Sequence, residues 1–272
     1  MAVNGLARIW SAIRAGGAPR VALISWRPPD GTRNFGDELS RVIVAAMASR
    51  YAIDPQGAAR ASKRLLAVGS IVDWARSGDV VWGTGMRGMD ILPRRGVRPD
   101  IRAVRGPLTA SALRARGLAV PSIFGDPALL LPRLFPGRFQ PAAADADYVV
   151  IPHFADLSRL PPDERILSPL SPWEQCVERI AGAGFVISGS LHGIVVAEAF
   201  GVPARYLRLS DFEPQFKYDD HAQATGRDRL VPAVSVEDAL TKGPDVPARI
   251  DTAALEAAFP ADLWQAGPQS PV

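Results

Sequence analysis

Residues 188–203 read SGSLHGIVVAEAFGVP, and they place His192 where an apolar strand pattern gives way to a helical one. The backbone N–H groups at the start of a helix, together with the helix dipole, favour a bound anion. Histidine titrates near neutral pH, so His192 is positioned to donate or accept a proton beside that anion. A lone histidine is more often structural than catalytic, but only three occur in the chain. We therefore take His192 as the candidate general acid or base, with Ser190, Leu191 and Gly193 around the anion.

Other loops also carry polar residues at places where a strand pattern ends. Before the helix predicted over 38–50, Asn34 and Asp37 lie beside glycines that let the backbone approach a ligand. Asp37 can equally serve as the N-cap of that helix. Arg105 closes an apolar strand and can clamp a carboxylate or a phosphate, the alternative being a surface ion pair. Asp126 stands in a Gly-Asp-Pro sequence that is typical of a tight turn.

Short apolar strands and helices alternate along the chain, and they must position these residues. The patterns predict strands over 21–26, 64–70, 80–85, 101–106, 148–154, 165–170, 185–190 and 204–209, and helices over 38–50, 107–117, 171–184, 191–201 and near the C-terminus. A Pro- and Ala-rich stretch, 133–147, is the best linker candidate. The two series predict an α/β fold with two Rossmann-like parallel-sheet domains facing across a cleft. We assign them to residues 1–135 and 145–272, with the last helix packing back on the first domain.

Composition excludes several classes of protein. With 272 residues, 47% of them hydrophobic, the chain can form one large or two medium domains with real cores. The net charge of +3 comes without a Lys/Arg run, which argues against nucleic-acid binding and suits an anionic substrate or membrane surface. The single cysteine, Cys176, excludes an internal disulfide and reads as a buried structural thiol. No apolar run approaches 18 residues, so we expect a cytoplasmic protein.

The N-terminal stretch has a helical pattern of its own. Leu6, Ile9, Trp10 and Ile13 recur at helical spacing, with arginines nearby. This pattern predicts a short amphipathic helix that lies on an anionic membrane surface with tryptophan as its anchor. The alternative is a helix packed on the surface of the first domain.

Short motifs occur in a fixed order along the chain. They are N-F-G-D (34–37), A-V-R-G-P (103–107), G-D-P (125–127), S-L-H-G with A-E-A-x-G-x-P (190–203), and F-K-Y-D-D with T-G-R (216–227). Each is weak alone, but the ordered set resembles the polysaccharide pyruvyltransferase family, most closely the xanthan-type ketal pyruvyltransferases of bacterial exopolysaccharides. The likeness runs from Gly31 to Trp264. It implies a fold like that of two-domain glycosyltransferases (GT-B-like), with phosphoenolpyruvate as the donor.

The resemblance also implies a reaction and roles for the candidate residues. Pyruvate would pass from phosphoenolpyruvate to two hydroxyls of a sugar, forming a cyclic ketal and releasing phosphate, with no metal or further cofactor. His192 and Asp37 would be catalytic. The donor would lie against the second domain and the acceptor against the first. The donor residues would be Arg105, Ser190, Leu191, Gly193, Lys217 and Arg227, and the acceptor residues Asn34, Asp37 and Asp126.

One departure from the family pattern bears on donor binding. Many members have an arginine directly before Leu-His-Gly, where this chain has Ser190. The anionic groups of the donor then need another cation, and Arg105, Lys217 and Arg227 are the candidates.

The resemblance further implies an acceptor oligosaccharide on a polyprenyl diphosphate carrier. The protein would then be peripheral, at the inner face of the cytoplasmic membrane. Two alternatives stay open. One is a metal-independent nucleotide-sugar glycosyltransferase on the same two-domain fold. The other is a non-catalytic subunit of a polysaccharide assembly complex.

Overall fold

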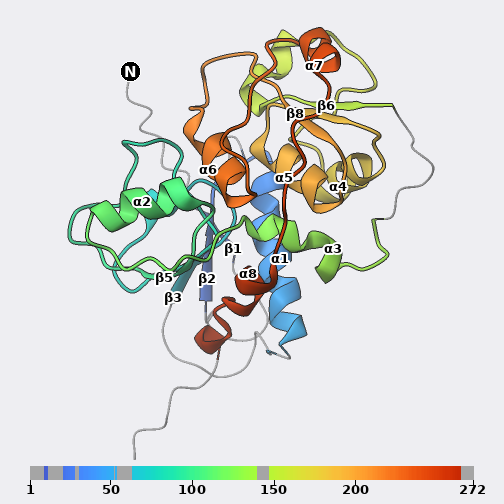
Figure 1. Ribbon diagram of the computed structural model, residues 1–272. Helices are drawn as coiled ribbons and strands as arrows, with labels where there is room; N and C mark the ends of the chain where they lie inside the picture. Colours follow the sequence, from blue (N-terminus) through green and yellow to red (C-terminus); the bar gives the residue numbers. More distant parts are fainter. Residues whose placement is uncertain are drawn as a thin grey trace, which may run out of the picture.

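The computed structural model describes residues 9–11 (backbone only), 21–27, 31–51, 53, 63–139 and 147–264, which form two sheets (Figure 1). Within these residues the first sheet has five strands in chain order. They are β1 (Ile9–Ser11), β2 (Val21–Ser25), β3 (Lys63–Leu66), β4 (Val80–Trp82) and β5 (Asp100–Ala103). Strands β2 to β5 are parallel, and β1 is antiparallel to β2. The predicted α/β class with parallel sheets is confirmed.

The second sheet contains three parallel strands over the described part of residues 147–264. They are β6 (Val149–Ile151), β7 (Val186–Ser188) and β8 (Ala204–Tyr206), again in chain order. All of their residues are buried, as expected for apolar strands covered on both faces. The segment predicted as a strand over 165–170 contributes only an isolated bridge, Ile166 to Val150.

Helices connect and cover the strands. They are α1 (Phe35–Arg50), α2 (Pro107–Ala115), α3 (Leu131–Leu134), α4 (Trp173–Ala181), α5 (Leu191–Ala199), α6 (Phe216–Ala224), α7 (Val236–Lys242) and α8 (Ala253–Ala257). Short 3-10 helices add to them, among them η2 (Pro127–Leu130) and η3 (Phe154–Arg159). Helix α1 buries one apolar stripe and begins at Asn34, whose side chain accepts a hydrogen bond from the Gly36 N–H at 3.1 Å. Helix α5 is apolar on nearly every side, which explains its place in the middle of the molecule.

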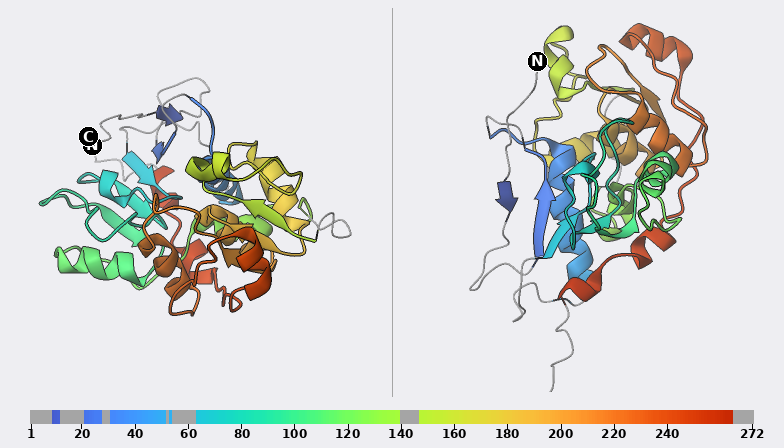
Figure 2. Two further views of the ribbon diagram at one scale, coloured as in Figure 1. Left: turned by 90° about the horizontal axis from the view of Figure 1, so that it is seen from above. Right: turned by 90° about the vertical axis from the view of Figure 1, so that its left-hand side faces the viewer.

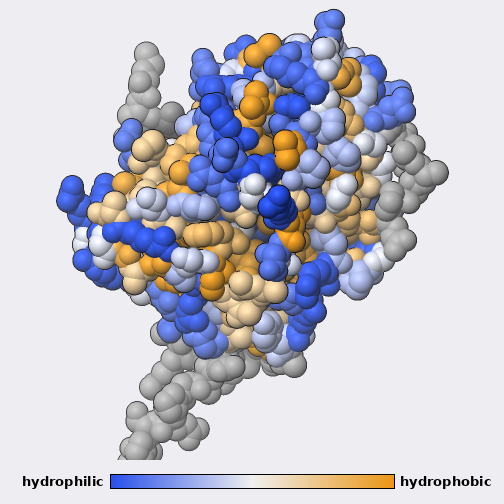
Figure 3. Space-filling model, in the orientation of Figure 1, coloured by the Kyte–Doolittle hydropathy of each residue, from blue (hydrophilic) through white to orange (hydrophobic). Residues whose placement is uncertain are grey.

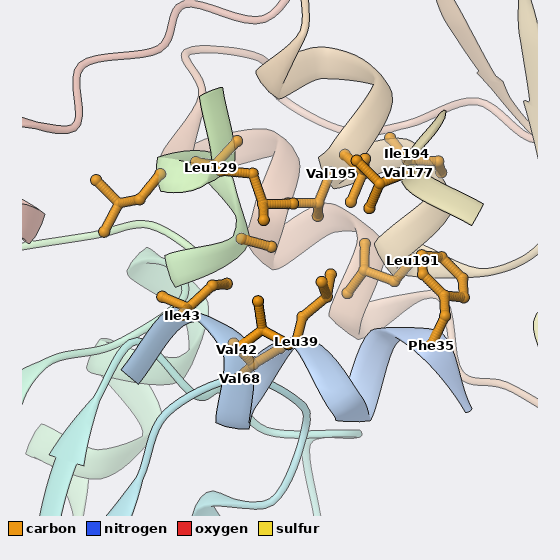
Figure 4. Packing of buried hydrophobic residues seen from close by; sticks show 14 of the residues in the cluster. Phe35, Leu39, Val42, Ile43, Val68, Leu129, Val177, Leu191, Ile194 and Val195 are labelled. Atoms are coloured by element: carbon orange, nitrogen blue, oxygen red, sulfur yellow. The ribbon is translucent and has the colours of Figure 1, made fainter. Parts of the chain in front are cut away.

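One hydrophobic core joins the helices of both halves. Figure 4 shows α1 facing the helices of the second half, with Leu39 and Ile43 on one side and Leu191 and Val195 on the other. Leu129 of η2 closes the same cluster. Because this core is continuous, the two sheets are held together by buried contacts. The predicted arrangement of two domains across a cleft stays a prediction.

The predicted N-terminal amphipathic helix is wrong over the residues that the structure describes. Ile9–Ser11 form β1, which pairs with β2 in the register Ile9 to Ser25 and lies at the outer edge of the sheet (Figure 2). β-Branched and aromatic residues favour strands, and the free edge of β2 offers backbone partners that an isolated helix lacks. Leu6 and Ile13 lie outside the described residues.

The stretch predicted as a linker, 133–147, is packed over its first part. Phe139 is buried and contacts Trp173 and Phe200, and α3 ends inside this stretch. The burial of aromatic side chains, rather than the Pro and Ala content, determines how this stretch packs. Residues 140–146 lie outside the description.

The C-terminal segment folds back on the first sheet (Figure 1). The indole N–H of Trp82, in β4, donates a hydrogen bond of 2.8 Å to the carbonyl of Leu255 in α8. Glu256 pairs with Arg50 and Arg133, which come from α1 and α3. Helix α8 therefore ties three segments of the first half together.

The surface mixes both kinds of residue. On the face shown in Figure 3, hydrophilic residues crowd the outer edges and hydrophobic residues show toward the middle and lower left. Within the described residues no helix is long and apolar enough to cross a membrane.

Candidate active site

Two of the sequence motifs meet at the N-terminal ends of α1 and α5. The first residues of these helices, Phe35 and Leu191, lie side by side in Figure 4. The residues that follow them are in contact: a Cβ added at Gly36 would stand 2.0 Å from Nδ1 of His192. Position 36 therefore requires a glycine, because the imidazole ring of His192 occupies the space that a side chain would need. The packing of the helices thus fixes the position of His192.

A buried carboxylate lies on the other side of the imidazole. His192 Nε2 is 3.7 Å from Oδ2 of Asp126, and neither atom has a hydrogen-bond partner among the described residues. The other oxygen of Asp126 caps η2 by accepting from the Ala128 N–H at 2.9 Å. Burial lowers the pKa of His192 to about 4, although Asp126 acts to raise it. The ring is therefore neutral at physiological pH and is ready to accept a proton.

Asp126 does not lie where the sequence interpretation placed it. We expected it to bind the acceptor, but its side chain is fully buried and is divided between the cap of η2 and His192. A residue with no exposed surface does not reach a sugar. Asp126 is better described as a positioning residue for the His192 ring.

Asp37 stands free in the first turn of α1 because Asn34, and not Asp37, is the N-cap. The side-chain oxygen of Asn34 accepts a hydrogen bond from the Gly36 N–H, so this oxygen is less available for the acceptor than we expected. Burial raises the pKa of Asp37 to about 7, opposed by Lys217 and reinforced by Asp126. A carboxyl group with this pKa is present in both forms near neutral pH, so it can act as an acid or a base.

Arg105 is not the exposed clamp that the sequence suggested. Its side chain is 0% exposed and pairs with Asp220 of α6, with Nη2 at 3.0 Å and Nε at 3.1 Å from the same oxygen. It also donates to the Ser70 hydroxyl at 2.6 Å and to the carbonyl of Met86. The guanidinium thus joins the first sheet to α6, and its expected role in holding the donor stays a prediction.

Three further predicted donor residues, Arg227, Gly193 and Leu191, also have structural roles. Arg227 makes two hydrogen bonds to Glu198, of 2.6 Å and 3.0 Å, at the far end of α5 from His192. A Cβ added at Gly193 would stand 2.2 Å from the Ser188 hydroxyl, so this glycine lets α5 pack against β7. The Leu191 side chain belongs to the core. What remains for an anion is the backbone of the first turn of α5, which no side chain caps.

Lys217 is the predicted cation that the structure brings to the site. It influences the pKa of both Asp37 and His192, and its Nζ lies 2.9 Å from Glu213. Glu213 is also contacted by Arg87, with Nη2 at 2.9 Å, and by Nε2 of His153 at 3.4 Å. Burial and Lys217 lower the pKa of His153 to about 4, so this ring is neutral. Two cations therefore share one carboxylate on this side of the site.

Comparison with known proteins identifies the part of the chain that carries this site. The family model described as "Polysaccharide pyruvyl transferase" matches residues 97–211. Residues 97–211 belong to the polysaccharide pyruvyl transferase family. This pyruvyl transferase segment contains Asp126, His153 and His192, whereas Asp37, Lys217 and Glu213 reach the site from outside it.

Two curated relatives extend the comparison. The chain is 30% identical over 156 residues to the succinoglycan biosynthesis protein ExoV of Rhizobium meliloti (strain 1021), which covers 53% of this chain and 47% of that protein. It is 27% identical over 177 residues to the uncharacterized protein L143 of Acanthamoeba polyphaga mimivirus, which covers 60% of each. The matches thus span about half the length of the curated relatives. No solved structure matches the chain.

The sequence interpretation missed the residues around Glu213. Neither Glu213 nor Arg87 stands in a recognisable motif, and His153 is not among the candidate residues named from the sequence. Their roles depend on contacts between positions 126 residues apart, as with Arg87 and Glu213. One signal was available, because His153 follows a strand at its carboxyl end, where the pyruvyl transferase segment also carries His192.

Replacing Gly36 by alanine should test the contact between the two motifs. The new methyl group would overlap the His192 ring and force it to move. A shift of about 1 Å in a reacting group can lower turnover by up to about 100-fold. The measurement is turnover beside a thermal melt. Gly88→Ala is the control, because its added Cβ would make only ordinary contacts, with Pro214 at 3.5 Å and Ile91 at 3.9 Å. Equal turnover for the two variants would show that His192 does not need its present position.

Replacing Asp37 by asparagine should change how the stability of the protein depends on pH. The folded protein binds the Asp37 proton more tightly than the unfolded chain, since the pKa rises from 3.8 to about 7. This carboxyl group therefore lowers stability as the pH rises from about 4 through about 7. We expect Asp37→Asn to raise the melting temperature at pH 8, with a gain that shrinks toward pH 4. Glu38→Gln, which removes a surface pair with Arg33, should show no such trend. A gain that is independent of pH would contradict the buried setting of Asp37.

Proposed function

We propose that this protein transfers the pyruvyl group of phosphoenolpyruvate to two hydroxyls of one sugar during exopolysaccharide synthesis. The product is a cyclic pyruvate ketal, and phosphate is released. The observation that carries the proposal is the convergence of Gly36, His192, Asp126 and Lys217, from four separate motifs, on one cluster of acid–base groups. The match of residues 97–211 to the polysaccharide pyruvyl transferase family supports the reaction class. The name of the relative from Rhizobium meliloti supports an exopolysaccharide as the product.

The donor would bind between the start of α5 and Lys217. Phosphoenolpyruvate carries a carboxylate and a phosphate, which require amide donors and cations. The uncapped amides at the start of α5 supply the amide donors, and Lys217 and Arg87 supply the cations. Arg105 and Arg227 pair with carboxylates elsewhere in the fold, whereas Lys217, itself paired with Glu213, acts on both Asp37 and His192. We therefore assign to Lys217 the role that the family gives to the arginine missing at Ser190. The Glu213 carboxylate holds Lys217 and Arg87 toward each other, ready for the anion.

The reaction needs one proton at C3 of phosphoenolpyruvate and the removal of one proton from each sugar hydroxyl. We assign the first to Asp37, whose pKa of about 7 keeps part of it protonated at neutral pH. Protonation of C3 leaves C2 electron-poor, and the first hydroxyl adds there while neutral His192 takes its proton. The C2–O bond to phosphate then breaks and the second hydroxyl adds. Of the two hydroxyl protons, one ends on C3 and the other on phosphate, so the step is balanced.

The carrier to which the acceptor oligosaccharide is attached is proposed from the resemblance to the family alone. Family members act on oligosaccharides carried by polyprenyl diphosphate at the inner face of the cytoplasmic membrane, and we extend this location to the present protein as part of the proposal. Ile9–Ser11 form a strand, so the proposal does not rely on the helical membrane anchor that we had expected there. Membrane association would then rest on the acceptor itself and on the positive net charge of +3.

Phosphate release is the direct test. The purified protein is incubated with phosphoenolpyruvate and a set of exopolysaccharide repeat oligosaccharides, and phosphate is followed together with the methyl signal of a ketal by NMR. Phosphate and ketal appearing in equal amounts would support the proposal. A parallel incubation with nucleotide sugars covers the glycosyltransferase alternative. Nucleotide release there, with no phosphate from phosphoenolpyruvate, would overturn the proposal, and no turnover in either would favour a non-catalytic subunit.

Replacing Lys217 by methionine should weaken donor binding selectively. Methionine keeps the length of the side chain and removes its charge. A hydrogen bond to a charged group contributes about 1.5 to 3 kcal/mol, so the KM for phosphoenolpyruvate should rise about 10- to 100-fold, with a smaller change for the acceptor. Lys242→Met is the control, because Lys242 pairs with Asp238 in α7. Equal effects on both substrates would remove Lys217 from the donor site.

A further inference from the structure

A group of aromatic rings lies next to the proposed donor site. Trp26 and Phe154 have ring centroids 5.4 Å apart, Phe154 and Phe212 5.9 Å, and His153 lies 4.4 Å from Phe154 and 5.1 Å from Phe212. We call these four residues the aromatic platform. They contact one another across a sequence separation of more than 180 residues, from Trp26 to Phe212, so the fold and not the local sequence brings them together.

The platform is built from loops that follow strands of both sheets. Trp26 comes directly after β2, His153 and Phe154 follow β6, and Phe212 follows β8. These are the carboxyl ends of parallel strands, where ligands bind in α/β proteins. The two sheets thus both contribute to the same surface.

The platform is exposed where a core cluster would be buried. The Phe212 side chain is 49% exposed, and Trp26 and Phe154 are each only partly buried. A partly exposed apolar surface that is rimmed by polar residues can serve as a ligand-binding surface.

Polar groups of the proposed active site border the rings. The guanidinium of Arg87 lies 5.4 Å above the ring of Phe212, and the same arginine pairs with Glu213. His153 belongs to both groups, because its Nε2 is 3.4 Å from Glu213. A ligand that covers the rings would therefore reach hydrogen-bonding groups at its edge and the Lys217 side of the site beyond them.

We propose that the aromatic platform binds the acceptor sugar by stacking against one face of its pyranose ring. A pyranose has C–H groups on its ring faces and hydroxyls around its edge, and an exposed aromatic ring with polar neighbours matches both. Phe212 is the main stacking residue, and His153 contacts the hydroxyls at the edge, next to the Arg87 that holds the donor. This inference rests on the proposed function, to which it adds the position and the chemical class of the acceptor.

The test uses sugar probes and does not depend on turnover. Methyl β-D-glucopyranoside, methyl β-D-galactopyranoside and methyl α-D-mannopyranoside are each mixed with the full chain, and saturation-transfer NMR reports which ring hydrogens contact the protein. We expect at least one of them to bind, with saturation concentrated on the hydrogens of one ring face. Excess phosphoenolpyruvate should not displace it.

Substitutions at Phe212 locate the binding. Phe212→Leu keeps apolar area but removes the ring, and it should weaken binding about two- to tenfold, the range found for aromatic pairs beyond their area. Phe212→Tyr should bind like the unaltered protein. Leu240→Ala is the matched control, since Leu240 is comparably exposed at 44% on α7, away from the rings. Trp26→Ala gives a second, independent variant from the other sheet.

The outcomes separate this inference from the proposed function. Sugar binding that is lost in Phe212→Leu and kept in Leu240→Ala supports the platform even if phosphoenolpyruvate is never consumed, in which case the reaction alone is wrong. If none of the three glycosides binds, or if binding survives both Phe212→Leu and Trp26→Ala, the platform does not hold the sugar. Phosphate release from phosphoenolpyruvate in that same protein would show that the function stands without it.

Discussion

His192→Ala should lower the rate of phosphate release by about 100- to 10,000-fold, the range for loss of a general acid or base. The ring is held between the Gly36 backbone and the Asp126 carboxylate, and it is the group that we assign to take the proton of the first hydroxyl. The melting temperature should stay close to that of the unaltered protein, because the ring makes no hydrogen bond within the described residues through Nε2. The measurement is the initial rate of phosphate release at saturating phosphoenolpyruvate.

Asp126→Asn provides the comparison for this variant. It keeps the cap of η2 and removes the charge that favours a protonated His192. We expect a smaller loss of rate than for His192→Ala, together with a downward shift of the acidic limb of the pH–rate profile. Turnover of His192→Ala above about a tenth of normal would show that the ring is structural.

Asp220→Ala should destabilise the fold by about 3 to 5 kcal/mol, the usual effect of leaving a buried partner uncompensated. Asp220 is fully buried and accepts hydrogen bonds from Arg105, from the Thr109 N–H at 2.8 Å and from the Thr109 hydroxyl at 2.7 Å. Its loss leaves the Arg105 guanidinium charged and unpaired inside the protein. The free energy of unfolding, from denaturant titration, measures the effect.

A surface pair gives the control for Asp220→Ala. Asp262 pairs with Arg102 at 2.9 Å, but its side chain is 49% exposed, so Asp262→Ala should change stability by no more than about 1 kcal/mol. Replacing both buried partners, as Arg105→Met with Asp220→Leu, should recover much of the loss because no charge is left behind. A single Asp220→Ala variant as stable as Asp262→Ala would mean that water reaches Arg105.

The sequence predicted the elements better than it predicted the contacts between them. Strands of a parallel sheet that is covered on both faces are continuous apolar runs. The runs at 149–151 and 186–188 have this pattern, so their strands could be recognised. The prediction for the N-terminal segment failed because apolar residues at helical spacing can also form an edge strand when a free strand edge is nearby. Strand pairing is a tertiary property, and the local pattern does not contain it.

The same distinction explains the fate of the site residues. His192 was found because a strand-to-helix junction is a local feature with a known electrostatic consequence. The burial of Arg105 was not predicted because its partner, Asp220, lies 115 residues away, and the sequence near either residue does not indicate the ion pair. The raised pKa of Asp37 likewise depends on burial by segments distant in sequence. Residue types indicated which groups could react, while the fold decided which of them are free to do so.

The hydrogen bond between Trp82 and Leu255 has a consequence for how the chain acquires its structure during synthesis. The two residues are separated by 173 positions, so a ribosome adding about 5 to 20 residues each second makes the second one roughly 10 to 35 seconds after the first. Until then the first sheet lacks α8 and the Glu256 pairs with Arg50 and Arg133. The nascent first half therefore waits in an incomplete state, with an indole N–H and apolar surface open to chaperones, and its folding is finished from the far end of the chain.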